Sequence, residues 1–329
     1  MTKIIKTLKS SRVFATVCAF LASAIWGSSF VTQKIAGQYM GAFTYNGIRF
    51  ALGTLALLPA IMFWDKKIKN NPAGNSSENS QKHSVQNVNA PPVNTVFVNL
   101  FIGRTRLMGL AGGAVLFLAS NLQQFGIVLS NSPSSASEAG FITGMYTVFV
   151  PILGLAVGRK TRLPVWVGAV LAFGGLALIS IDLNEAIPIQ ASDTLLLLCA
   201  ALWAVHILLI DKFINNIDPL RFAAEQFAVC SILCIISALI FESVDIQAIR
   251  AALPILLFGG IVVSGLAYTL QIISQRKVAP SKAAIIFSLE ALFAALAETL
   301  FLGETMTTQK YFGGAIIFAG VILSQRKRD

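Results

Sequence analysis

The charged side chains best suited to chemistry lie inside long apolar stretches of this 329-residue sequence. Glu290 lies deep in one stretch, where an ionised carboxylate would bind a cationic group such as an ammonium and a protonated one could carry a proton. A carboxyl that is only hydrogen-bonded to a neighbouring helix is the alternative. Arg49 lies near the start of another stretch and could hold a carboxylate, or cap the end of a neighbouring helix.

A polar stripe is the second candidate feature. Ser264, Tyr268, Gln271 and Gln275 are spaced at i, i+4, i+7 and i+11, which places them on one face of a helix. Such a stripe can hydrogen-bond a solute, or it can hold neighbouring helices together.

Two tryptophans lie near the middle of apolar stretches instead of near their ends, where interfacial tryptophans gather. Trp26 and Trp203 could therefore wall a cavity and bind organic cations or rings, or they could pack between helices. Ser29 and Gln33 continue the face of Trp26. His206 shares a face with Trp203 and could be a packed imidazole or a proton relay.

The composition places these residues in a membrane protein. Hydrophobic residues make up 55% of the sequence, charged residues 12%, and the mean hydropathy is +0.73. Soluble domains carry about 25% charged residues. Apolar stretches of about 18 residues or more can cross the hydrocarbon layer as helices. Ten are predicted, at 13–35, 43–63, 107–129, 137–157, 163–181, 194–213, 219–241, 251–273, 281–302 and 309–324.

The distribution of basic residues predicts the orientation. With the N-terminus in the cytoplasm, 21 of the 25 Lys and Arg residues fall on the inner side, and only Lys34, Arg49, Arg250 and Lys310 fall outside. The positive-inside rule then places both termini in the cytoplasm. The net charge of +10 is therefore a topology signal and not a sign of nucleic-acid binding.

The predicted organisation has four parts. Residues 1–12 form a cytoplasmic N-terminus, and a cleavable signal peptide is disfavoured because apolar character continues past Ala22-Ser23-Ala24. Residues 13–181 form a first five-helix unit that includes a disordered cytoplasmic loop at about 65–106, rich in Asn, Ser, Gln and Pro. Residues 182–324 form a second unit, and 325–329 a basic tail.

The two units look like repeats. An offset of 177 positions aligns Trp26 with Trp203 and Arg49 with Gln226. Further along, Tyr146 aligns with Glu290, and both units end with two glycines seven positions apart, Gly168/Gly175 and Gly313/Gly320. Five spans per unit is an odd number, so the second unit must enter the membrane from the opposite side. Inverted repeats of this kind are the architecture of secondary transporters, with the substrate site near the midplane.

In the third span, Asn121 and Gln124 share a face, and Gln123 lies beside them. The complete set of candidate substrate-binding or pathway residues is Trp26, Ser29, Arg49, Asn121, Gln123, Gln124, Tyr146, Trp203, His206, Gln226, Ser264, Tyr268, Gln271 and Glu290.

Several motifs carry a family resemblance. They are WGSSF at 26–30, Leu122-Gln123, GFITGMYTVFVPILG at 140–154, AYTLQ at 267–271, Gln275-Arg276-Lys277, and SLEALFAAL at 288–296 with Gly303-Glu304. With these motifs the sequence resembles the ten-helix EamA-type permeases of the drug/metabolite transporter superfamily, over nearly the whole chain outside residues 65–106. The resemblance implies export of amino acids or related metabolites through a central cavity open alternately to each side. Glu298, where small residues are usual, and the long loop depart from the family pattern.

The expected partners are a small-molecule solute, the lipids of the plasma membrane and, if Glu290 titrates, protons as a coupling ion. No cofactor, metal or nucleic acid is expected, because metal-ligand spacing and a nucleotide-binding P-loop are absent from the sequence. An intramembrane enzyme is a weaker alternative, since no nucleophile–base pair has suitable spacing. A membrane receptor or scaffold that acts through the long loop is the other alternative.

Reporter fusions test the predicted topology. A fluorescent protein that folds only in the cytoplasm should be bright when it is fused to either end of the chain. A periplasmic phosphatase fused at the same positions should be inactive. Reporters that place the two ends on opposite faces of the membrane would contradict an even number of spans.

Overall fold

A computed structural model describes residues 12–69, 104–130, 135–180, 190–213, 218–303 and 305–325. Within these ranges the regular secondary structure is entirely helical, which confirms the all-α prediction. Eight helical stretches are long and apolar enough to cross a membrane. They are Arg12–Ala36, Ala42–Phe63, Leu107–Leu129, Ala136–Ala156, Ala191–Phe213, Pro219–Phe241, Leu253–Gln275 and Pro280–Leu302.

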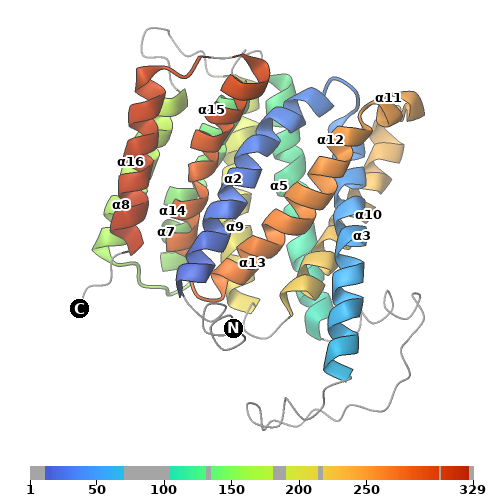
Figure 1. Cartoon of the computed structure of the whole chain (residues 1–329), viewed down its shortest axis with the longest axis horizontal. Coiled ribbons are helices and arrows are strands. Elements are labelled where there is room, and N and C mark those ends of the chain that lie inside the picture. Colours follow the sequence, from blue (N-terminus) through green and yellow to red (C-terminus); the bar gives the residue numbers. More distant parts are fainter. Residues whose placement is uncertain are drawn as a thin grey trace.

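The first half of the chain contributes six helices to the described bundle (Figure 1). They are α2 (Arg12–Ala36), α3 (Ala42–Lys69), α5 (Arg104–Leu129), α6 (Ser135–Gly144), α7 (Tyr146–Ala156) and α8 (Leu163–Ser180). Helix α3 continues to Lys69 and α5 begins at Arg104, so both edges of the predicted 65–106 loop are helical. The rest of that loop, most of the predicted N-terminus, residues 326–329 and Glu304 lie outside the described residues.

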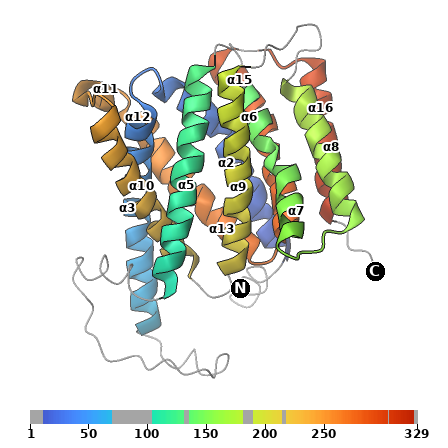
Figure 2. The ribbon, with the colours of Figure 1, turned by 180° about the vertical axis from the view of Figure 1, so that it is seen from behind.

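The second half of the chain contributes the remaining described helices, and Figure 2 shows the whole bundle from behind. These helices are α9 (Ala191–Phe213), α10 (Pro219–Phe241), α11 (Ile246–Ala251), α12 (Leu253–Leu257), the π-helix η3 (Phe258–Tyr268), α13 (Thr269–Gln275), α14 (Pro280–Phe287), α15 (Leu289–Leu302) and α16 (Thr308–Gln325). Two of the ten predicted spans, 163–181 and 309–324, coincide with α8 and α16, which are helical but fall outside the eight long apolar stretches. The count of ten stays a prediction.

Two spans are interrupted near their middle. Met145 separates α6 from α7 with φ −59° and ψ −15°, and Ser288 separates α14 from α15 with φ −62° and ψ −13°. The Ser288 hydroxyl donates to the carbonyl oxygen of Ile285 at 2.8 Å, a bond to the preceding turn that often bends helices. The two interruptions lie directly before Tyr146 and two residues before Glu290.

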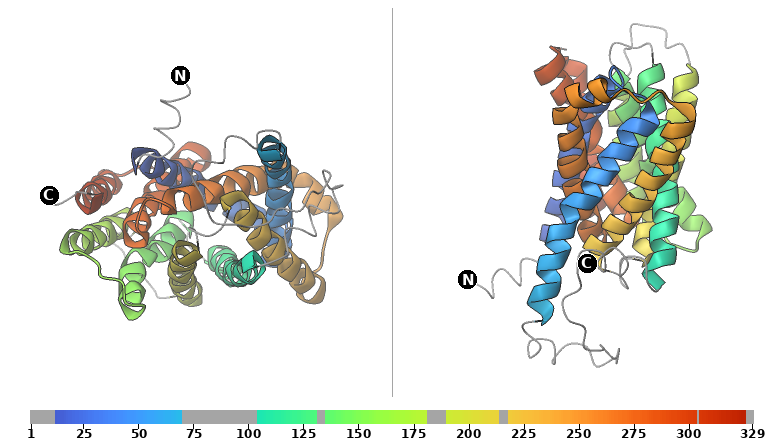
Figure 3. Two further views of the ribbon diagram at one scale, coloured as in Figure 1. Left: turned by 90° about the horizontal axis from the view of Figure 1, so that it is seen from below. Right: turned by 90° about the vertical axis from the view of Figure 1, so that its right-hand side faces the viewer.

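The helices form an elongated bundle. Seen from below, α8 and α16 lie at one end of the section and α3 and α10 at the other (Figure 3). Between them α5 packs on α9, α2 on α13 and η3, α15 on α2, and α7 on α9. Helix α2 begins and helix α16 ends at the same end of the bundle (Figure 1). Exposed large apolar side chains such as Ile236, Leu239 and Ile240 cover its outer surface, as lipid contact requires.

Helices α8 and α16 meet backbone to backbone. A Cβ atom on Gly175 would lie 2.5 Å from the carbonyl oxygen of Gly313, and one on Gly320 would lie 2.7 Å from that of Gly168. Real Cβ atoms do not approach so closely, and small residues are what permits such contact between membrane helices. The repeated glycine spacing of the sequence is therefore a packing seam.

Replacing Gly175 by alanine should destabilise the protein. The added methyl group must push α8 and α16 apart, and overpacking of this kind costs about 1–3 kcal/mol. Gly174 is a matched control, because a Cβ there would meet nothing within 4 Å, so Gly174→Ala should leave the melting temperature unchanged or raise it slightly. Thermal unfolding of the purified protein in detergent measures both. Equal melting temperatures for the two variants would show that the seam tolerates a wider separation.

Candidate functional site

A cavity lies in the centre of the bundle. Nine helices contribute to its wall, namely α2, α3, α5, α7, α9, η3, α13, α14 and α15. The lining residues are Trp26, Ser29, Phe30, Gln33, Arg49, Gln123, Tyr146, Trp203, Ile207, Val263, Tyr268, Gln271, Phe287 and Glu290.

Most of the residues selected from the sequence meet in this cavity. Those that line it are Trp26, Ser29, Arg49, Gln123, Tyr146, Trp203, Tyr268, Gln271 and Glu290. These residues come from helices far apart in the chain. Residue spacing within one helix could therefore not predict that they lie around the same cavity.

Glu290 faces the cavity from the second residue of α15. The Tyr146 hydroxyl donates to its Oε1 at 2.9 Å, so one carboxylate oxygen has a partner from the first half of the chain. Helix α2 lies directly against the start of α15, because a Cβ on Gly27 of α2 would lie 2.5 Å from the Glu290 carbonyl oxygen. With 6% of its surface exposed, Glu290 is a buried acid held at the cavity wall.

Arg49 brings a positive charge to the same cavity from α3. Its guanidinium carbon lies 4.6 Å from the Phe50 ring centroid and 5.2 Å from that of Tyr45, within the range of cation–π contacts. Its Nε is buried and has no hydrogen-bond partner among the described residues. The side chain therefore has aromatic neighbours but no neutralising carboxylate in the described part of the chain, and an anionic ligand would supply one.

An amide network forms another part of the wall. Trp203 Nε1 donates to Gln123 Oε1 at 2.8 Å, and Gln123 Nε2 donates to Gln33 Oε1 at 3.2 Å. Gln33 in turn donates to the Ser29 hydroxyl at 3.3 Å. These bonds connect α9, α5 and α2 and fix the orientation of the Gln123 amide at the cavity surface.

Aromatic rings surround Tyr268. Its ring centroid lies 5.1 Å from that of Trp26, 5.5 Å from that of Phe227 and 6.1 Å from that of Trp203. Trp26 also contacts Phe287 edge to face at 5.4 Å, and its indole Nε1 has no partner among the described residues. The cavity therefore has flat apolar walls together with an unused N–H donor.

Five candidates do not line the cavity. Asn121 accepts from Asn46 at 3.0 Å, and Gln124 donates to the Gln33 carbonyl oxygen at 2.9 Å. His206 and Gln226 share a hydrogen bond of 2.9 Å between α9 and α10. The prediction that these residues could touch a solute has no support from their placement, because their bonds join neighbouring helices.

Ser264 is the fifth of these candidates. It lies on η3 against α3, where a Cβ on Gly53 would come within 2.8 Å of its Cβ. Its hydroxyl is buried without a partner among the described residues. The predicted polar stripe is thus divided, since Tyr268 and Gln271 reach the cavity whereas Ser264 and Gln275 do not.

The lining residues not selected from the sequence are Phe30, Gln33, Ile207, Val263 and Phe287. Gln33 could have been found, since it shares the helix face of Trp26 and Ser29. The four apolar residues look like any other membrane-facing or core residues in the sequence, and only the tertiary structure selects them.

Glu298 has a structural environment. Ser137, near the start of α6, donates its backbone N–H to Glu298 Oε1 at 3.2 Å and its hydroxyl to Oε2. Carboxylates are favourable at helix N-termini because the N–H groups of the first turn lack intrahelical partners. Glu298 is fully buried there and is absent from the cavity wall.

No cluster of three or more His, Cys, Asp or Glu side chains suited to a metal ion occurs in the described ranges. The four cysteines, Cys18, Cys199, Cys230 and Cys234, are buried and free. Cys234 accepts a hydrogen bond from Asn121 at 3.2 Å, so its contacts are structural.

A helical bundle with many apolar spans around a central cavity of polar and charged groups is the design of membrane transporters. The profile of the EamA-like transporter family matches residues 13–181 and 190–325, and the chain belongs to this family. It is therefore a multi-pass membrane protein and a membrane transporter.

Relatives agree with this assignment. Two proteins of Archaeoglobus fulgidus, each named an uncharacterized transporter, are similar over 313 residues. One is 27% identical, covering 95% of this chain and 86% of the relative. The other is 25% identical, covering 94% and 96%. The crystal structure of another protein has the same fold, with a TM-score of 0.68. The two sequences are 14% identical, and the match covers 96% of this chain and 97% of that one.

Glu298→Ala should destabilise the fold, because it leaves the buried donors of Ser137 without acceptors. Loss of such a cap costs about 0.5–2 kcal/mol. Glu298→Gln keeps one acceptor oxygen and should lose less. Melting temperatures measured in detergent should fall in the order parent, Glu298→Gln, Glu298→Ala. A Glu298→Ala protein with the melting temperature of the parent would contradict the capping role.

Proposed function

We propose that this protein is a secondary transporter that exports amino acids or related small metabolites by alternating access. The observation that carries the proposal is that Arg49 and Glu290, of opposite charge, line one cavity with aromatic walls. An amino acid has a carboxylate, an ammonium and a side chain, and the cavity offers a matching surface for each.

The carboxylate would bind Arg49. Arg49 is 3% exposed and has no ion pair within the described residues, so a bound carboxylate would neutralise a buried charge. Bonds between an arginine and a carboxylate are among the stronger hydrogen bonds of proteins and are often bidentate. The unpartnered indole N–H of Trp26 is a further donor at the wall.

The ammonium would bind Glu290, whose second oxygen makes no hydrogen bond to the described residues. The apolar part of the solute would lie among Trp26, Tyr268 and Phe287. A second role for Glu290, as the carrier of a coupling proton, is favoured by its burial at the cavity wall. The two roles are compatible if proton and solute compete for the same carboxylate.

The architecture proposed for this function is two inverted five-helix units, residues 13–181 and 182–324. The helix contacts support it because they occur in corresponding pairs. The contact of α5 with α9 corresponds to that of α13 and η3 with α2, and the contact of α7 with α9 corresponds to that of α15 with α2. The contacts α8–α16 and α3–α10 join corresponding helices of the two units.

Two further features favour duplication. The interruptions at Met145 and Ser288 fall in corresponding helices with nearly equal dihedral angles. The family profile also matches the chain in two stretches, residues 13–181 and 190–325. Solute would pass between the units as they rock about the central cavity, in a plasma membrane with both termini on the cytoplasmic side.

Flux into proteoliposomes tests the proposal with a panel of radiolabelled amino acids, organic cations and sugar phosphates. Saturable movement of one or more amino acids is expected. Arg49→Gln should raise the KM for these about ten- to a hundredfold, the worth of a charged hydrogen bond of roughly 1.5–3 kcal/mol. Arg250→Gln is the control, because Arg250 is exposed on α11 and should leave the KM unchanged.

The same assay examines Glu290. Glu290→Gln should raise the KM for an amino acid but not for the analogue that lacks the amine. Comparing the transport rates with and without a pH gradient tests proton coupling. Normal transport by Glu290→Gln at every pH would remove both roles. A protein that moves none of the panel would favour the receptor or scaffold alternative.

A further inference from the structure

We infer that an ion pair between Arg159 and Asp211, together with a hydrogen bond from Gln275 to the carbonyl oxygen of Ile207, forms a gate at the cytoplasmic end of the cavity. The inference rests on the proposed transport function. It adds the residues that control access to the site from one side of the membrane.

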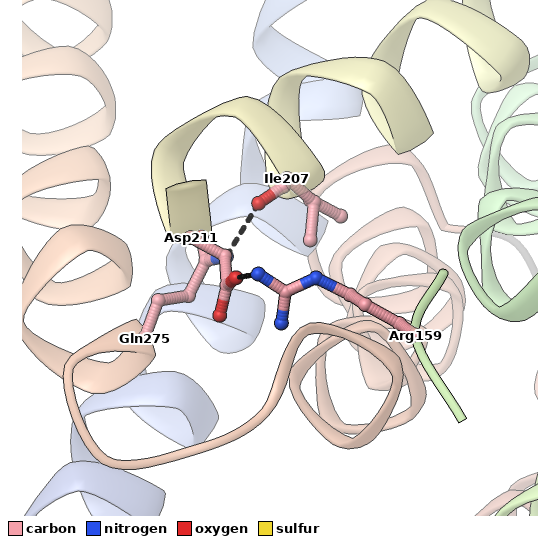
Figure 4. A network of polar contacts seen from close by, with 4 residues as sticks. All are labelled: Arg159, Ile207, Asp211 and Gln275. Atoms are coloured by element: carbon pink, nitrogen blue, oxygen red, sulfur yellow. Dashed lines mark hydrogen bonds and ion pairs between the residues drawn. The ribbon is translucent and has the colours of Figure 1, made fainter. Parts of the chain in front are cut away.

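Both contacts involve the last two turns of α9. Gln275, the last residue of α13, donates its Nε2 hydrogen to the Ile207 carbonyl oxygen at 2.8 Å. Asp211, one turn further along α9, forms an ion pair with Arg159 of the segment between α7 and α8. In Figure 4 the Arg159 side chain reaches from that segment to Asp211, beside the Gln275–Ile207 bond. Three segments are thereby joined at one end of the bundle.

The gate is continuous with the cavity. The side chain of Ile207 lines the cavity, and so does Gln271, which lies one turn before Gln275 on the same face of α13. The Oε1 atoms of Gln271 and Gln275 are both buried without hydrogen-bond partners in the described part of the chain. Buried amide oxygens of this kind are expected to bind water or ligand. If α13 separated from α9, these oxygens would line a polar route from the cavity to this end.

The ion pair has the exposure that a reversible contact needs. The Arg159 side chain is 44% exposed and that of Asp211 13%, so water reaches one partner and the other lies nearer the interior. Exposed ion pairs contribute little free energy, and fully buried ion pairs are costly to break. An ion pair of intermediate exposure can stabilise a closed state and still separate. Arg159 belongs to the first proposed unit and Asp211 to the second, so rocking of the units would change their separation.

The charges around the gate indicate which side it closes. Lys160, Arg162, Lys212 and Lys277 lie within two residues of the gate residues or of the segment that carries Arg159. Basic residues concentrate on the cytoplasmic side of membrane proteins. The structure is therefore closed on its cytoplasmic side.

Cysteine labelling tests the gate without any known solute. Gln271→Cys places a thiol at the cavity wall, and the native cysteines, all buried, give the background in the parent protein. In inside-out vesicles a membrane-impermeant maleimide should label this thiol slowly. Adding Arg159→Gln or Asp211→Asn should raise the rate about two- to fivefold, which corresponds to the worth of a partly exposed ion pair. Exchanging the charges, Arg159→Asp with Asp211→Arg, should bring the rate back toward that of the single reporter.

Lys160→Gln is the matched control, because it removes a neighbouring positive charge without removing the ion pair, and it should leave the labelling rate unchanged.

An unchanged labelling rate with both Arg159→Gln and Asp211→Asn would overturn the gate, as would an equal rise in the rate with Lys160→Gln. Arg159→Gln keeps the test valid if an Asp211 variant fails to fold, since Arg159 lies at the surface. A rise seen only in right-side-out vesicles would overturn the cytoplasmic placement. Labelling reports access and not flux, so failure of the transport assays would overturn the proposed function while leaving this result in place.

Discussion

A charged or hydrogen-bonding group inside a membrane protein must find its partner within the protein, because lipid offers none. Four charged residues of the described chain meet that requirement in two ways. Glu242 accepts hydrogen bonds from the backbone N–H groups of Phe43 and Thr44 at the start of α3, and Glu298 does the same for Ser137 at the start of α6. Arg49 and Glu290 instead lie at a cavity, with aromatic neighbours or a single hydrogen bond.

This difference separates acids and bases that build the fold from those available to a ligand. The carboxylates at helix N-termini have both oxygens occupied, so they offer nothing to a solute. The guanidinium of Arg49 and one oxygen of Glu290 remain without hydrogen-bond partners among the described residues. A similar distinction applies to the amides, since Gln123 and Gln33 bond to each other at the cavity surface, whereas Gln226 and His206 bond to each other between helices.

The sequence predicted the all-helical membrane fold because composition and the length of apolar stretches depend only on the bilayer. It also predicted a set of residues of which many converge on the cavity, since polar groups in an apolar span must face inward. It could not separate Glu298 from Glu290. Both are carboxylates in the same apolar stretch, and only the tertiary structure places a helix N-terminus opposite one and a cavity beside the other. The division of the polar stripe, with Ser264 against Gly53 and Gln271 at the cavity, depends in the same way on which helix packs opposite each turn.

The two indoles of the cavity give the protein a built-in optical probe. The sequence has four tryptophans, and two of them, Trp26 and Trp203, form part of the wall. Indole emission depends on the polarity and the quenching groups around the ring. A solute that displaces water beside Trp26, or that disturbs the bond from Trp203 to Gln123, would therefore change the ultraviolet emission of the unlabelled protein. Ligand screening could then proceed by fluorescence titration, before any radiolabelled compound is made.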